Sequence, residues 1–117
     1  MIPVYAAQRV RALDRAVIEQ VGVPGRQLME LAGRDAAKAI HTRWPDARTG
    51  VFCGPGNNGG DGYVVARWLA HWGHDVRVWG PRPPASPDAR ANRALCEAMG
   101  LKAGAAPAPG EVDVVVD

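Results

Sequence analysis

The pattern of apolar positions divides the chain into a helical first part and a second part in which short apolar runs alternate with helices. From residue 6 to residue 21, and again from about residue 26 to residue 43, apolar side chains recur every three or four positions. Both patterns predict amphipathic helices, the second ending before Pro45. Its expected buried face carries Leu28, Leu31, Ala32, Ala36, Ala39 and Ile40.

Beyond residue 45, continuous apolar runs replace the helical period. They predict buried strands at residues 50–53, 75–79 and 112–117, with a shorter candidate at 101–103. Helices are expected between them, over residues 61–72 and 86–99. This alternation predicts a parallel sheet with helices on both faces. Since a covering helix normally follows a parallel strand, and the sequence ends on an apolar strand, we expect these 117 residues to be a fragment of a longer domain.

A string of nine residues, GPGNNGGDG, fills positions 54–62 between the first strand and the next helix. Gly54, Gly56 and Gly59 match the dinucleotide-binding template G-x-G-x-x-G. An ordinary dinucleotide site also needs an acidic residue after the second strand, where residues 79–82 read Trp-Gly-Pro-Arg. A phosphate-binding P-loop would need Lys and then Ser or Thr after its last glycine, which this string lacks. Both interpretations are therefore disfavoured.

The string remains suited to an oxygen-rich ligand, because it leads into the N-terminus of a helix. Asn57, Asn58 and Asp61 add amide and carboxylate groups, which are hard ligands for alkali or alkaline-earth cations. Asp117 ends another strand and is expected at the same edge of the sheet. Asn58 and Asp117 could thus hold a cation beside a polar small molecule. Turn formation at the asparagines, helix capping by Asp61 and a solvated Asp117 are the structural alternatives.

Composition narrows the class of protein. The 117 residues suffice for one domain, and 14 Lys and Arg against 12 Asp and Glu give a net charge of +2 without a basic stripe, so we expect no nucleic-acid partner. The two cysteines do not form a disulfide framework. With neither a signal peptide nor an apolar run of membrane length, we expect a cytoplasmic protein. The small residues at positions 32–37 are a candidate homodimer face.

The string and the residues after it, GPGNNGGDGYVVARWL, resemble the NAD(P)H-hydrate epimerases, also called the YjeF N-terminal domain family. Other parts of the family pattern are present as well: Gln8, Asp14, the Gly-Val-Pro turn at 22–24, Leu-Met-Glu-Leu-Ala-Gly at 28–33 and the final apolar strand. The resemblance covers essentially residues 1–117. It implies a Rossmann-like three-layer α/β sandwich with a mostly parallel sheet, preceded by two N-terminal helices.

The resemblance also implies a repair reaction. The family interconverts the R and S epimers of hydrated NADH and NADPH (NADHX and NADPHX), and a fused or separate ATP- or ADP-dependent dehydratase then restores the cofactor from the S form. Carried over by position, five residues would contact the hydrate: Asn57, Asn58, Gly59, Gly60 and Asp61. Asn58 and Asp117 would bind K⁺.

Two motifs of the family are absent from these residues, and alternative functions therefore stay open. A Gly-Thr-Gly loop and an Asp-Ile-Pro-Ser-Gly stretch, whose aspartate is taken as the catalytic base, do not occur here, so no catalytic residue is assigned. A non-catalytic dimerisation or scaffold module on the same fold is the alternative function, and an ordinary nicotinamide dehydrogenase is a third. The sequence does not distinguish NADHX from NADPHX: Arg82 could meet a 2′-phosphate, but loop arginines are common.

Overall fold

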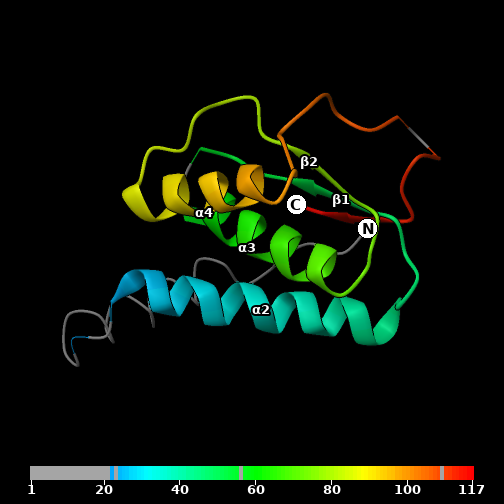
Figure 1. Cartoon of the computed structure of the whole chain (residues 1–117), viewed down its shortest axis with the longest axis horizontal. Coiled ribbons are helices and arrows are strands. Elements are labelled where there is room, and N and C mark those ends of the chain that lie inside the picture. The colour runs from blue at the N-terminus through cyan, green and yellow to red at the C-terminus, as the bar shows by residue number, and fades with distance from the viewer. Residues whose placement is uncertain (1–21, 23, 56, 109) are drawn as a thin grey trace.

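A computed structural model describes residues 22, 24–55, 57–108 and 110–117, with the backbone alone for residues 57–59. The first expected helix, at residues 6–21, lies outside the described residues. The elements follow in the order α2 (Gly25–Arg43), β1 (Thr49–Phe52), α3 (Asn57–His71), β2 (Val76–Trp79), α4 (Pro87–Ala98) and β3 (Val114–Val116) (Figure 1).

The strands form a parallel sheet in the order β2-β1-β3. Val51 at its centre lies opposite Val78 of β2 and Val116 of β3. A parallel bridge joins Val78 to Ala103, and the Gly104 N–H donates to the Val78 carbonyl at 2.9 Å. The short strand expected at 101–103 is therefore a single bridge on the outer side of β2. The resulting spatial order is that of the first four strands of a Rossmann sheet, and the expected parallel α/β fold is confirmed.

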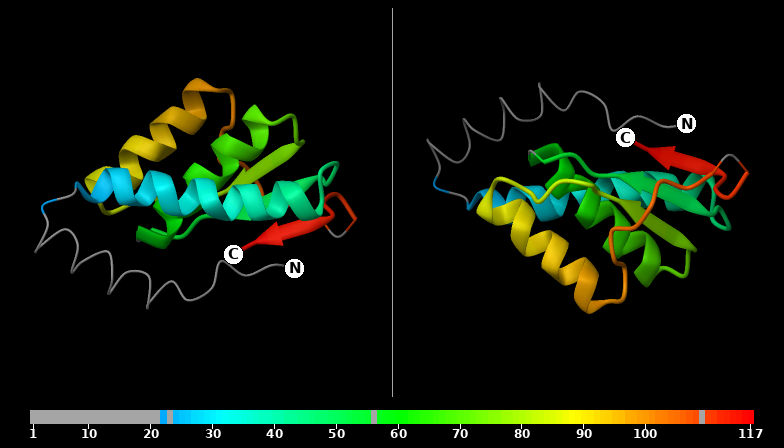
Figure 2. Two further views of the ribbon diagram at one scale, coloured as in Figure 1. Left: turned by 90° about the horizontal axis from the view of Figure 1, so that it is seen from below. Right: turned by 90° about the horizontal axis from the view of Figure 1, so that it is seen from above.

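The three described helices form one layer. Helix α3 packs against β1 and β2, with α2 on one side of it and α4 on the other (Figures 1 and 2). They supply one of the two helical layers expected from the sequence. On the other face of the sheet, the rings of Phe52 and Trp79 pack edge to face, with their centroids 5.2 Å apart. Pro107 and Val112 lie against Gly50 on the same face.

The buried face of α2 differs from the expected one. Met29, Gly33, Ala37 and Ile40 are buried, whereas Leu31 is 55% exposed and Ala39 is also exposed. Ile40 is buried as expected and Ala36 packs against the core, so the prediction was wrong for Leu31 and Ala39. Two neighbouring faces of this helix carry apolar residues, and their spacing alone does not choose between them. A Cβ placed at Gly33 would lie 2.4 Å from Val64 Cγ1 of α3. Gly33 thus brings two helices of one chain together, so Gly33 and the buried Ala37 are not available to the expected dimer face.

A cluster of polar side chains links the three helices of this layer to one another. Glu30 of α2 accepts hydrogen bonds from Arg67 Nη2 and from Trp68 Nε1 of α3. Arg67 Nη2 also donates to Asn92 Oδ1 of α4 at 3.2 Å, and the Asn92 amide in turn donates to the Asp88 carbonyl. One carboxylate therefore helps to align all three helices, so that Glu30 in the Leu-Met-Glu-Leu-Ala-Gly stretch has a structural role.

The starts of β1 and β3 are joined by one ion pair. Arg48 contacts the Asp113 carboxylate through Nε at 3.1 Å, Nη2 at 2.9 Å and its backbone N–H at 2.9 Å. The backbone adds an Asp113 N–H to Arg48 carbonyl hydrogen bond of 2.7 Å. The side-chain and backbone hydrogen bonds from Arg48 lower the pKa of Asp113 from 3.8 to about 2. Since the folded-state pKa is the lower one, this carboxylate contributes stability above pH ~4 that is lost as the pH falls towards 2.

Asp113→Asn should accordingly lower the urea midpoint of unfolding at pH 6, because the variant loses the charge that Arg48 binds. The difference from the original protein should shrink as the pH falls from 4 through about 2, because the original protein loses that charge over this range. Arg48→Gln should show the same convergence. A midpoint difference that stays constant from pH 6 to pH 2 would contradict the assignment.

A contact between Tyr63 and Gly80 shapes the end of β2. Tyr63 of α3 is fully buried, and its hydroxyl has no hydrogen-bond partner among the described residues. A Cβ placed at Gly80 would lie 2.4 Å from that hydroxyl oxygen but 3.5 Å from the ring carbon that carries it. The hydroxyl alone therefore excludes a side chain at position 80.

This contact predicts that removing the Tyr63 hydroxyl reduces the cost of a side chain at position 80. Gly80→Ala alone should destabilise the protein by about 1–3 kcal/mol through overpacking. Tyr63→Phe alone should be close to neutral or stabilising, because it removes a buried polar group without a partner. In the Tyr63→Phe background, Gly80→Ala should cost at least ~0.5 kcal/mol less, as measured by a double-mutant cycle of urea unfolding. Equal costs in the two backgrounds would show that the clash is not with the hydroxyl.

Candidate functional site

A cavity of about 280 Å³ opens at the carboxyl ends of all three strands. It is lined by the residues at the end of each strand or just beyond it: Phe52, Cys53, Gly54 and Pro55 from β1, Trp79, Pro81 and Arg82 from β2, and Asp117 from β3. The glycine string therefore begins in the wall of the cavity, and Asp117 stands on the same edge, as expected from the sequence.

The topology explains why a cavity forms here. The chain passes from β1 to β2 on one side of β1 and later returns to β3 on its other side. The connections therefore diverge between β1 and β3, which makes this edge a topological switch point, the usual ligand site of open α/β sheets. Gly54 follows β1 and Asp117 follows β3, so the two residues flank the divergence.

The cavity combines an apolar wall with charged ends. Phe52 and Trp79 give it two aromatic side chains, and Pro55 and Pro81 add apolar rings. Arg82 and Asp117 are both exposed and carry opposite charges at the ends of β2 and β3. Such a lining suits a ligand with flat rings and polar substituents. Phe52, Pro55, Trp79 and Pro81 were not among the predicted site residues, although their place at or just after strand ends is the pattern by which they could have been found.

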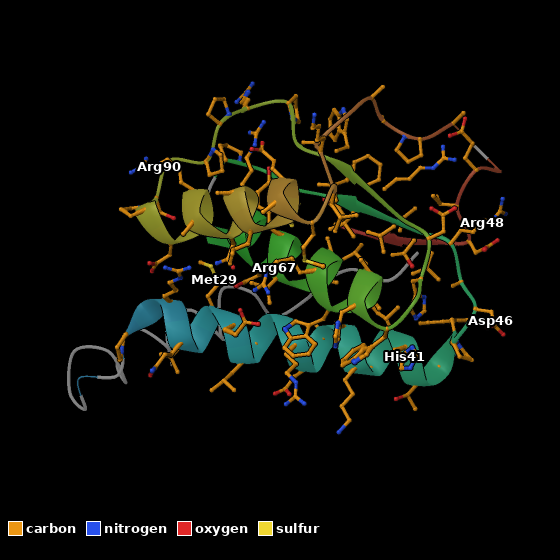
Figure 3. The ribbon with its side chains drawn as sticks, viewed as in Figure 1. Met29, His41, Asp46, Arg48, Arg67 and Arg90 are labelled. Atoms are coloured by element: carbon orange, nitrogen blue, oxygen red, sulfur yellow. The ribbon has the colours of Figure 1, made fainter. Side chains whose placement is uncertain are left out.

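The loop between β2 and α4 is fixed by three hydrogen bonds. The Ala85 N–H donates to the Pro55 carbonyl at 2.8 Å, which ties this loop to the glycine string. Arg93 Nη1 donates to the Arg82 carbonyl at 3.2 Å, and Arg90 Nη1 donates to the Ala85 carbonyl at 2.8 Å. Figure 3 shows Arg90 near the start of α4, far from Arg48 and Asp46 at the other end of the strands. The loop is therefore attached both to the glycine string and to α4.

Helix α3 begins at Asn57, four residues before the expected start at Asp61. The prediction was wrong because Asn and Gly are poor helix formers, and here tertiary packing overrides propensity. Asp61 is the fifth helical residue, so it is not the N-cap. The five predicted contact residues, Asn57, Asn58, Gly59, Gly60 and Asp61, occupy the first turns of α3, where the leading N–H groups have no intrahelical acceptor.

Two glycines of the string have packing roles. A Cβ at Gly60 would lie 2.7 Å from Met29 Sδ of α2 and 3.1 Å from Ala89 Cα of α4. A Cβ at Gly62 would lie 2.9 Å from Cys53 Sγ at the end of β1. These glycines let the start of α3 lie close to the sheet and to both neighbouring helices, so packing alone accounts for two of the glycines in the string.

No metal cluster of the usual protein ligands accompanies the cavity: the described residues contain no group of three or more His, Cys, Asp and Glu side chains able to hold an ion. A cation here would therefore depend on amide and carbonyl oxygens together with Asp117. That donor set suits K⁺ and other hard cations rather than zinc or copper.

The two cysteines are unsuited to nucleophilic chemistry. Cys53 lines the cavity but is only 2% exposed, and Cys96 donates a hydrogen bond to the Tyr63 carbonyl from the buried side of α4. Burial raises the pKa of both thiols, that of Cys96 to about 12. Each thiol is therefore protonated at neutral pH, and thiolates are the reactive form.

Both cysteines should consequently resist Ellman's reagent at pH 8 in the folded protein and react fully in guanidinium chloride. Cys53→Ala would identify which thiol reacts if one does. Rapid modification of Cys53 in the folded state would contradict its burial in the cavity wall.

None of the described helices is long and apolar enough to span a bilayer.

The chain has relatives along its whole length. Residues 25–117 match the family model described as YjeF-related protein N-terminus. A protein of Rhodobacter capsulatus named NAD(P)H-hydrate epimerase is 39% identical over 129 residues, covering 100% of this chain and 61% of the relative. One of the same name from Rhodopirellula baltica is 37% identical over 127 residues, covering 99% and 51%. The chain thus spans about half to three fifths of the length of these two relatives.

Two further matches extend the comparison. The bifunctional NAD(P)H-hydrate repair enzyme Nnr of Thermanaerovibrio acidaminovorans is 45% identical over 104 residues, covering 88% of this chain and 19% of that protein. Among solved structures, the crystal structure of yeast ynu0 (YNL200c) superposes with a TM-score of 0.70 at 25% identity, over 99% of this chain and 46% of the yeast chain.

Proposed function

This chain belongs to the YjeF-related N-terminal family, and from that premise we propose that it acts as an NAD(P)H-hydrate epimerase. Residues 1–117 would form the N-terminal part of the family's domain. One observation carries the proposal: the cavity that joins the start of the glycine string to Asp117, in a chain 39% identical to a protein named for this activity.

The geometry suits the substrate. A hydrated nicotinamide is a ring that carries a hydroxyl and an amide, and the cavity offers an apolar wall with polar groups at its rim. We place the hydrate between the ends of β1 and β3, where the N–H groups that begin α3 face an oxygen-rich ligand. In this proposal the contacts come from Asn57, Asn58, Gly59, Gly60 and Asp61.

The reaction itself asks little of the protein beyond positioning and proton transfer. The carbon that inverts carries both a hydroxyl and the ring nitrogen. A proton delivered to the hydroxyl lets it leave as water, and the water that adds to the other face of the carbon then gives up a proton, so the reaction consumes none overall. Holding the ring in one orientation and moving one proton to and from the hydroxyl would suffice. None of the described residues is assigned to that proton transfer.

K⁺ is proposed as the cofactor. Asn58 and Asp117 would hold it with an amide and a carboxylate oxygen, in agreement with the donor set at this edge of the sheet. When bound, the ion would supply a positive charge that orients the polar groups of the substrate. Asp117, exposed at the cavity rim, is able to face such an ion.

The proposal is tested by following the epimerisation of R-NADHX by the full-length protein at varied K⁺ and constant ionic strength, with the S form detected by an excess of an S-specific dehydratase. Turnover should depend on K⁺. Asn58→Ala and Asp117→Asn should lower it roughly 100-fold, the scale of a lost positioning group, and raise the K⁺ concentration that gives half activity.

Asp46→Asn is the matched control, since Asp46 is an exposed carboxylate at the opposite end of the strands (Figure 3). It should leave both the rate and the K⁺ dependence unchanged. No epimerisation of either hydrate by the folded protein would overturn the proposed function. Turnover independent of K⁺ and of Asp117 would overturn the proposed cation site alone.

Partners follow from the same proposal. Since several relatives are named bifunctional repair enzymes, we propose that the S epimer passes to a dehydratase, either fused or separate. A homodimer remains part of the proposal, but its interface must lie elsewhere than on Gly33 and Ala37, which are buried inside the chain. The cytoplasm, where soluble nicotinamide cofactors occur, is the proposed compartment.

A further inference from the structure

The end of β2 carries an arginine where dinucleotide-binding folds recognise the adenosine ribose. In such folds an acidic residue at this place binds the 2′-hydroxyl of NAD, and an arginine nearby accommodates the 2′-phosphate of NADP. After β2 this chain has Gly80, Pro81 and Arg82, without a carboxylate. Arg82 lines the same cavity as the glycine string and Asp117.

The guanidinium of Arg82 is available for a ligand. In the described part of the chain its side chain takes part in no hydrogen bond or ion pair. By contrast, four other arginines are paired with carboxylates: Arg48, Arg67, Arg77 and Arg93. Arg82 is also exposed at the cavity rim. A guanidinium with free N–H donors suits the bidentate recognition of a phosphate.

Its backbone is held in place before any ligand binds. Arg93 donates to the carbonyl of Arg82 itself, and three residues later Ala85 is tied to Pro55 of the glycine string and to Arg90. Pro81, Pro83 and Pro84 restrict the backbone further. Because this segment is already ordered, a ligand that contacts Arg82 loses less free energy to ordering the loop.

The two ends of the cavity carry opposite charges. Asp117 lies after β3 on one side of β1, and Arg82 lies after β2 on the other side of β1. With the hydrated ring placed between β1 and β3, the rest of the dinucleotide would extend across β1 towards Trp79 and Arg82. In this orientation the positively charged end of the cavity would lie at the adenosine end of the substrate.

We propose that Arg82 binds the 2′-phosphate of the adenosine ribose, so that the site prefers hydrated NADPH to hydrated NADH. The orientation of the substrate rests on the function proposed above. Recognition of the 2′-phosphate by Arg82 does not require turnover and can be measured by binding alone.

The test compares the binding of 2′,5′-ADP and 5′-AMP to the full-length protein by calorimetry at fixed ionic strength. These probes share adenosine and the 5′-phosphate and differ in the 2′-phosphate. We expect 2′,5′-ADP to bind at least ~10-fold more tightly, as one charge-assisted contact allows. Arg82→Gln should reduce this ratio to about 1–3 while changing the affinity for 5′-AMP less than ~3-fold. Arg82→Lys should retain part of the preference.

Arg43→Gln is the matched control, because it removes the same charge from an exposed arginine at the end of α2, which leads into the amino end of β1. It should leave the ratio unchanged. Equal binding of the two probes, no binding of either, or a ratio that survives Arg82→Gln would overturn the proposal.

Kinetics separate this proposal from the proposed function. A kcat/KM for R-NADPHX at least ~10-fold above that for R-NADHX, lost in Arg82→Gln, would support both. A 2′-phosphate preference that depends on Arg82, without epimerisation of either hydrate, would retain the subsite and overturn the function. Epimerisation of both hydrates at equal kcat/KM, unaffected by Arg82→Gln, would retain the function and overturn the subsite.

Discussion

Parallel pairing of β1 with a strand on each side is the constraint on which the rest of the structure depends. Val51 is 1% exposed, paired with Val78 and Val116 and covered by α3. Parallel register brings three carboxyl ends to one edge, although they lie far apart in sequence. Because each connection must return across the sheet, the loops that follow the strands collect there as well. The cavity is a consequence of the same hydrogen-bond ladders that stabilise the sheet.

Much of this arrangement could be predicted from the sequence. The apolar runs that became β1, β2 and β3 are short and bounded by Gly, Pro or Asp, and Ser86 caps α4 by accepting a hydrogen bond from the Ala89 N–H, as its position suggests. The place of Asp117 beside the glycine string followed from topology alone. These features depend on local pattern and on the direction of the strands, both of which a single sequence contains.

Other features depend on contacts between distant residues and were not predictable from the sequence alone. The early start of α3 at Asn57 requires Met29 and Ala89 to close around Gly60. The buried face of α2 is decided by where α3 lies, not by the spacing of its own side chains. The aromatic pair of Phe52 and Trp79 arises from strand register. Helix propensity did not determine where α3 starts, and the helical period did not determine which face of α2 is buried. In both cases packing against other elements decided the outcome.

The close approach of Gly62 to Cys53 and Val51 has a consequence for inherited variation in such proteins. A substitution there would separate the helix from the strand beneath it, and its first effect would be on the amount of folded protein in the cell, not on the turnover of each surviving molecule. Loss of function caused by a substitution at Gly62 would thus arise from a lower amount of folded protein, whatever its asparagine and aspartate neighbours contact. A loss-of-function allele in the string does not by itself identify a ligand contact.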